Sequence, residues 1–143
     1  MENGNILVLS ERQIMSVLDM PAALESVETS LREIAEGRCI NPMKLHMSLR
    51  PGIQGYLNSM PSCLLAQDVM GAKLVSVYKD NAKNFGLPVT MGTIVLHHPE
   101  SGLPFAVLGG TYITALRTGA AAGVGAKYLA RKDSHVLLQI GAG

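Results

Sequence analysis

The sequence is poor in the residues that mark several classes of protein. Its 143 residues include only two cysteines, Cys39 and Cys63, which lie far apart and form no CxxC pair. That pattern excludes a zinc framework or a disulfide scaffold and is typical of reduced thiols in the cytoplasm. Tryptophan is absent, aromatic residues make up 4%, and the formal net charge is +1 without any basic run. Nothing here favours binding to nucleic acid or to an anionic membrane.

Long hydrophobic runs are also missing. No stretch approaches the roughly 20 apolar residues that a membrane-spanning helix requires. The first residues, MENGNILVLSERQ, lack the basic and apolar regions of a signal peptide. We therefore expect a cytoplasmic protein that contacts no membrane. The apolar fraction of 48% and the charged fraction of 16% predict a globular chain with its own core.

The first 40 residues carry helix signals after one short apolar run. Residues 6–9 are predicted as a strand, and Ser10 and Gln13 have the spacing of a capping box that starts a short helix. Pro21 is suited to the first turn of a second helix. Gly37 is a natural stop for that helix. Its apolar stripe at helical spacing consists of Leu24, Val27, Leu31 and Ile34.

From about residue 43 the apolar pattern changes to that of strands separated by proline- and glycine-rich turns. The predicted strands are residues 44–49, 55–60, 72–78, 91–97 and 105–108, with a hairpin over 98–104 and a polar loop over 79–88. Thr111 is placed to cap a long helix over 112–130. The many small residues of that helix suggest close packing against another element. Residues 135–140 are predicted as a buried strand.

The chain ends in Gly141-Ala142-Gly143. A strand followed by Gly-x-Gly begins the dinucleotide-binding fingerprint, in which the glycines permit a tight turn and close approach of a pyrophosphate. The third glycine and the later acidic residue of that fingerprint are not in the sequence. Taken alone, this tripeptide is equally consistent with an ordinary glycine turn.

Several motifs in register carry a family resemblance. Thr-Ala-Leu-Arg-Thr at 114–118 and Ala-Lys-Tyr-Leu-Ala at 126–130 follow Met-Pro-Ala-Ala-Leu at 20–24, Ser-Met-Pro at 59–61 and Gly-Ala-Lys at 71–73. Over essentially its whole length the sequence resembles the ornithine cyclodeaminase/mu-crystallin family. The resemblance implies an α+β fold of N-terminal helices and a mostly antiparallel sheet. Residues 1–115 would form a substrate-binding and dimerisation domain, and 116–143 a connecting helix and the first strand of a truncated NAD(P)-binding Rossmann domain.

The resemblance also implies a set of substrate-binding residues. Arg117 and Lys73 match the family's cations at the substrate carboxylate, and Met60 is expected in the pocket wall. A guanidinium presents a planar fork to a carboxylate, and an unpaired ammonium in an apolar strand such as that of Lys73 is costly to bury. Lys44 stands where many relatives have arginine. An exposed surface position is the alternative for each of these three cations.

Cofactor contacts are expected at Thr118, Gly141 and Gly143, although the Thr118 hydroxyl has an alternative partner in a preceding helix carbonyl. The family's acid/base aspartate lies beyond Gly143, so no residue of this sequence is given a catalytic role. No metal site is expected. His97 and His98 are adjacent on a predicted strand and therefore point to opposite faces.

The implied function is that of an NAD- or NADP-dependent, homodimeric enzyme. It would carry out oxidative deamination and cyclisation, or imine reduction, of a small amino or imino acid. Ornithine itself is doubtful, because Asn58 stands where ornithine-using relatives have a glutamate. The alternatives are a non-catalytic protein that binds NADPH and a small acid, as in mu-crystallin, or a dimerisation module. The 143 residues by themselves are expected to be inactive.

Overall fold

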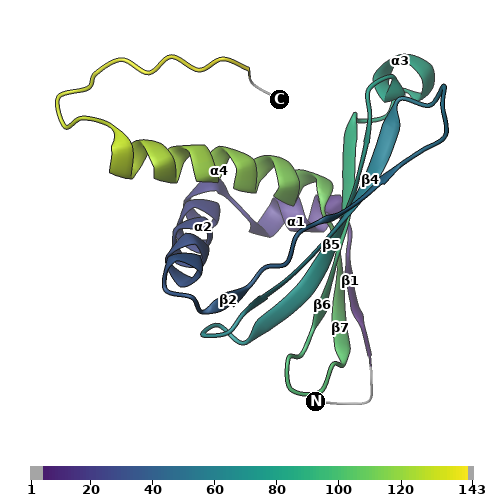
Figure 1. Cartoon of the computed structure of the whole chain (residues 1–143), viewed down its shortest axis with the longest axis horizontal. Helices are drawn as coiled ribbons and strands as arrows, with labels where there is room; N and C mark the ends of the chain where they lie inside the picture. The colour runs from purple at the N-terminus through teal and green to yellow at the C-terminus, as the bar shows by residue number, and fades with distance from the viewer. Residues whose placement is uncertain (1–4, 142–143) are drawn as a thin grey trace.

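The computed structural model describes residues 5–141, which form one mixed sheet with its main helices on one face (Figure 1). The elements in chain order are β1 (Leu7–Leu9), α1 (Glu11–Val17), α2 (Met20–Ala35), β2 (Cys39–Ile40), β3 (Leu45–Ser48), β4 (Gly55–Leu64), β5 (Val69–Tyr78), α3 (Asn81–Phe85), β6 (Thr90–His97), β7 (Pro104–Gly109) and α4 (Thr111–Leu129). The sheet has the order β1-β7-β6-β5-β4-β2, and β3 also pairs with β4. Only the β1–β7 pair is parallel. The predicted α+β class with a mostly antiparallel sheet is confirmed.

The two N-terminal helices begin as the sequence predicts. The Ser10 amide donates to Gln13 Oε1 at 2.9 Å, and the Gln13 amide donates back to Ser10 Oγ, which completes the capping box of α1. Asp19 caps α2 by accepting a hydrogen bond from the Ala22 amide at 3.0 Å, and Pro21 lies in the first turn. Both starts depend on local hydrogen bonds, which is why sequence spacing finds them.

Strands β4 to β7 are longer than predicted, β1 and β3 are shorter, and one short helix was missed. Strand β4 runs past Pro61 to Leu64 and β5 begins already at Val69, so these two strands pair over ten residues each. The missed strand β2 lies against the far end of β4. Residues 81–85, predicted as loop, form α3, and the Asn81 side-chain amide donates to the Pro88 carbonyl at 3.0 Å to close the following turn.

The start of α4 corrects the predicted cap. Thr111 is the first helical residue rather than the N-cap, which is Gly110 without a side-chain cap. The Thr111 and Tyr112 amides instead donate to the Glu11 carboxylate at 2.7 Å and 2.9 Å, across 100 residues of sequence. The Thr111 hydroxyl oxygen accepts a hydrogen bond from the Gly92 amide at 3.1 Å. The cap of α4 is therefore a tertiary contact.

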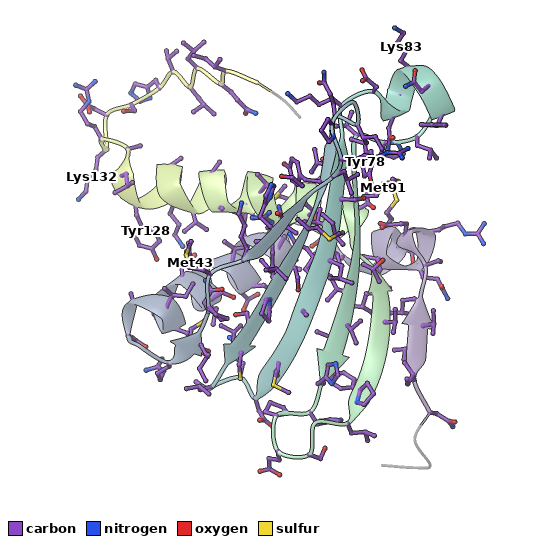
Figure 2. All side chains as sticks on the ribbon, turned by 45° about the vertical axis from the view of Figure 1, so that its right-hand side comes forward. Met43, Tyr78, Lys83, Met91, Tyr128 and Lys132 are labelled. Atoms are coloured by element: carbon purple, nitrogen blue, oxygen red, sulfur yellow. The ribbon has the colours of Figure 1, made fainter. Side chains whose placement is uncertain are left out.

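Helix α4 lies across α2, as the small residues in its sequence suggest (Figure 1). A Cβ atom at Gly123 would lie 2.9 Å from Leu24 Cδ2, and one at Gly119 would lie 3.4 Å from Met20 Cε. The predicted close packing is confirmed at Gly123, whereas a Cβ at Gly119 would make an ordinary van der Waals contact. In Figure 2, Tyr128 points from α4 toward α2, where its hydroxyl donates to the Glu28 carboxylate.

The segment after α4 departs from the prediction. Residues 135–140 form no strand, and the apolar side chains of this segment are exposed: Val136 by 91%, Leu137 by 81%, Leu138 by 82% and Ile140 by 93%. An extended segment becomes a strand only when a neighbour pairs with its backbone, and no strand of the described residues does so. Gly141 has a φ of +91°. Gly143, the other predicted cofactor glycine, lies outside the described residues.

The core lies between the three larger helices and the sheet. Its buried apolar side chains come from α1, α2, α4 and two central strands: Ile14, Ala23, Val75, Ala106, Ala120 and Val124. Within residues 5–141, none of the helices combines the length and the hydropathy that a membrane span needs.

Candidate carboxylate-binding site

Two of the predicted substrate-binding residues fall on one row across the sheet. In the register of β4 and β5, Met60 lies directly opposite Lys73. Leu45, the first residue of β3, pairs with Ser59, and Lys44 immediately precedes it. Directly opposed residues in neighbouring strands share a face. Met60 and Lys73 therefore lie side by side on one face of the sheet.

That face is the one covered by helices. Met60 and Lys73 line a pocket of about 280 Å³ together with Ser30 and Ile34 of α2 and Cys39 of β2. The pocket is framed by one end of α2, the short strand β2 and the middle of the sheet. Its walls are mainly aliphatic, and the ammonium of Lys73 is its one cationic group. A mainly apolar cavity with a single charged group is the usual form of a small-molecule site.

The electrostatics of this face favour an anion. Burial lowers the pKa of Lys73, and the positive charge of Arg117 on α4 lowers it further. Neither cation forms a salt bridge within residues 5–141. Two cations near each other without a carboxylate repel, and a bound carboxylate would remove that repulsion. The charge of Arg117 thus acts on Lys73, while the side chains of Arg117 and Lys44 are both exposed.

The position of Arg117 depends on how α4 is anchored. The Gly110 amide donates to the Gly92 carbonyl of β6 at 2.8 Å, and a Cβ at Gly110 would lie 3.0 Å from the Gly92 carbonyl carbon. The Glu11 carboxylate holds the first two amides of the helix from the other side. These contacts tie the start of α4 to the sheet about two turns before Arg117.

Of the predicted cofactor residues, Thr118 lies on an exposed side of α4 and Gly141 lies in the segment that follows this helix. Thr118 is exposed, and its hydroxyl donates to the Thr114 carbonyl at 2.7 Å. The alternative considered for Thr118, an intrahelical bond, is therefore present, and the hydroxyl oxygen keeps a lone pair for another donor. Gly141 has the positive φ of a tight glycine turn. The role of both residues remains a prediction.

The two adjacent histidines serve the hairpin between β6 and β7. His97 Nδ1 lies 3.0 Å from the Gly102 carbonyl oxygen, and the His98 ring stacks on Phe105 with centroids 4.5 Å apart. No group of three or more potential metal ligands occurs among the described residues.

Sequence reasoning missed one polar pair on the same face. His46 Nδ1 lies 2.7 Å from Oδ1 of Asn58, which is only 6% exposed. Asn58 was noted for the charge that it lacks, whereas His46 was overlooked. The alternation of β3, which puts His46 and Ser48 on one face, was the available signal.

The fold agrees with the comparison with known proteins. The model of the ornithine cyclodeaminase/mu-crystallin family matches residues 5–143, and the chain belongs to this family. Over 137 residues it is 39% identical to alanine dehydrogenase of Archaeoglobus fulgidus. The matched region covers 96% of this chain and 41% of that protein. The chain thus spans about two fifths of the length of this relative.

Solved structures with the same fold cover a similar share. An archaeal alanine dehydrogenase dimer with bound NAD superposes with a TM-score of 0.84 at 39% identity, over 90% of this chain and 38% of that one. The Thermococcus litoralis Delta(1)-pyrroline-2-carboxylate reductase in complex with NADH and L-proline gives 0.85 at 40% identity, over 90% and 39%. The described residues therefore have the fold of about two fifths of each of these relatives.

Proposed function

We propose that this chain forms the substrate-binding part of an NAD(P)-dependent enzyme that acts on a small amino or imino acid. The observation that carries the proposal is Lys73, a half-buried cation in the wall of a pocket of about 280 Å³ that has no salt-bridge partner in residues 5–141 and feels the charge of Arg117 on α4. A small carboxylic acid fits that charge and that size. Relatives that dehydrogenate alanine or reduce pyrroline-2-carboxylate act on such acids.

In this proposal the three cations position the substrate rather than react with it. Arg117 would grip the carboxylate through two parallel hydrogen bonds, while Lys73 and Lys44 would contribute single charges. Met60, opposite Lys73, would limit the depth to which the substrate enters the pocket. Holding the carboxylate at several points orients the neighbouring Cα, which is the contribution that positioning makes to rate.

The cofactor contacts of this chain would be few. NAD(P) accepts or donates the hydride when bound. The residues present fit one edge of such a site, since Thr118 is exposed with a free oxygen lone pair and Gly141 has the positive φ that a tight phosphate-binding turn uses. Thr118 would bind a phosphate or ribose group, and Gly141 would allow its close approach.

The same proposal includes a homodimer formed by the uncovered face of the sheet. On the face away from α2, three apolar side chains of β3 and β5 are exposed: Leu45 by 71%, Met47 by 50% and Leu74 by 43%. An apolar sheet face of this kind is typical of an interface. We expect Met47→Asp to shift the molar mass in analytical ultracentrifugation from dimer toward monomer, and Val17→Asp on α1 to leave it unchanged. A wild-type chain that is monomeric at high micromolar concentration would overturn this assignment.

The decisive assay for the enzyme uses the longest gene product that contains this chain. We expect absorbance changes of NAD(P)H with L-alanine, L-ornithine or a cyclic imine, and an increase of KM of at least about tenfold in Arg117→Lys, because lysine has no bidentate fork. Lys83→Met is the control, since Lys83 on α3 points away from the sheet in Figure 2. Absence of turnover with every amino and imino acid, together with tight NADPH binding, would instead favour the non-catalytic alternative. A cytoplasmic location, without contact to nucleic acid or membrane, completes the proposal.

A further inference from the structure

Helix α4 is attached to the rest of the protein near both of its ends. Its start is tied to the sheet through the Gly110 amide. Near its end, the carboxylate of Glu28 on α2 accepts hydrogen bonds from two consecutive residues, the Lys127 ammonium at 2.7 Å and the Tyr128 hydroxyl. Within residues 5–141, these are the side-chain hydrogen bonds that join the last two turns of α4 to another element. We call Glu28, Lys127 and Tyr128 the Glu28 clasp.

The Glu28 clasp differs from an isolated surface ion pair, which has little effect on a structure. The Glu28 side chain is only 20% exposed, and both of its oxygens are used, Oε2 by Lys127 and Oε1 by Tyr128. The hydrogen bonds from Lys127 and Tyr128 hold the pKa of Glu28 below its ordinary value, and the same contact with Glu28 raises the pKa of Lys127. Hydrogen bonds to an ionised acceptor are stronger than neutral ones. Because the two donors are adjacent on the helix, they fix its rotation as well as its position.

Apolar packing is sparse at this end of α4. The helix approaches α2 closely at Gly123, where a Cβ would lie 2.9 Å from Leu24 Cδ2. Toward its end, α4 and α2 instead border a groove of about 440 Å³ that Leu31 and Leu129 help to line. Leu31 is 44% exposed and Leu129 is 86% exposed. The polar contacts of the clasp are therefore the main restraint on the last turn.

The length of α4 makes its end more sensitive to a tilt than its middle. Figure 1 shows that the helix starts at the sheet, crosses α2 and continues into the segment that leads to Gly141. At about 1.5 Å per residue, Arg117 lies about 10 Å along the helix from Gly110, and Tyr128 lies about 27 Å from it. A tilt of about 5° at the start would move Arg117 by about 1 Å and Tyr128 by about 2.4 Å. Loss of the clasp would thus displace the segment after α4 more than it displaces Arg117.

We propose that Glu28 is a positioning residue: through the clasp it fixes the end of α4, and with it the segment leading to Gly141, relative to the carboxylate-binding residues Lys73 and Arg117. This inference rests on the proposed function, which assigns the substrate to one side of α4 and a cofactor contact to the other. Glu28 itself touches neither. A misplacement of about 1 Å between reacting groups can cost about a hundredfold in rate. Glu28 therefore acts on hydride transfer more than on substrate binding.

Kinetics of the longest gene product that contains this chain test the inference. With L-alanine and NAD(P)⁺, or pyrroline-2-carboxylate and NAD(P)H, we expect Glu28→Gln to lower kcat by about tenfold and to change KM by less than about twofold. Deuterium at the transferred position should slow the variant more than the wild type. Glu28→Lys should lower kcat further, and adding Lys127→Glu should restore kcat to within about threefold of wild type. Glu36→Gln, which removes an ion pair with Arg38 at the end of α2, is the matched control and should leave kcat unchanged.

Amide hydrogen exchange of the same protein without cofactor tests the clasp independently of catalysis. In Glu28→Gln, the amides of residues 124–130 should exchange at least about tenfold faster, while those of residues 111–117 should not change. Unchanged exchange would overturn the inference. So would an unchanged kcat and isotope effect in Glu28→Gln, whether stability falls or KM rises. If the wild type turns over no amino or imino acid but the exchange result is as expected, the proposed enzyme and the effect on hydride transfer are refuted, and the clasp as an anchor of α4 stands.

Discussion

The carboxylate of Glu11 provides the sharpest test of how this fold positions Arg117. It accepts hydrogen bonds from the Thr111 and Tyr112 amides, the first two of α4. A hydrogen bond to a charged group contributes about 1.5–3 kcal/mol. In Glu11→Gln the side-chain oxygen can keep one of the two bonds without the charge, and the favourable interaction with the helix dipole, worth about 0.3–1 kcal/mol, is lost as well.

We therefore expect Glu11→Gln to lower the free energy of unfolding by about 2 kcal/mol, measured by urea denaturation at pH 7. Glu25→Gln on the exposed side of α2 is the matched control, because the Glu25 side chain has no hydrogen bond to another described residue. Its effect should stay within about 0.5 kcal/mol. If the two variants are equally stable, the Glu11 carboxylate is not the cap of α4.

The difference between wild type and Glu11→Gln should also depend on pH. Burial raises the pKa of Glu11, but the hydrogen bonds from Tyr112 and Thr111 outweigh it, so the pKa is below its ordinary value of 4.5. A carboxyl group with a lowered folded-state pKa stabilises the protein fully above its unfolded pKa, and that stability is lost as the pH falls through the folded pKa. We expect the difference to be constant near neutrality and to shrink below pH 4.5. A difference that grows on acidification would contradict the assigned bonds.

Two further predictions concern residues near α4 and the pocket. Lys73→Met should raise stability by roughly 0.5–1 kcal/mol while abolishing carboxylate binding, because it removes a half-buried cation repelled by Arg117. Wild-type stability should rise with pH through the lowered pKa of Lys73, a slope that calorimetry should not find in the variant. Gly110→Ala should cost about 1–3 kcal/mol, since its Cβ would lie 3.0 Å from the backbone of Gly92. Gly125→Ala, with nothing within 4 Å, should stabilise α4 by up to about 1 kcal/mol, and the opposite order in thermal unfolding would refute the packing argument.

Local sequence signals were sufficient wherever the determining contacts are local. The capping box at Ser10 and Gln13 and the hairpin after His97 involve residues only a few positions apart. The alternation of β3, β4 and β5 assigns residues to faces, and the motifs around Lys73 and Arg117 indicate the family. The α+β class, the mostly antiparallel sheet and the candidate cations could therefore all be predicted from the sequence.

What the tertiary structure decided involves partners that are distant in sequence. The cap of α4 was assigned to Thr111, but a carboxylate 100 residues earlier performs it, because the sheet brings Glu11 to the helix start. Residues 135–140 have an apolar strand pattern, yet a strand needs a paired neighbour and they have none among the described residues. The pairing of His46 with Asn58 likewise depends on the register of β3 against β4. Sequence determined which residues can take part in the site, and long-range pairing determined which of them meet.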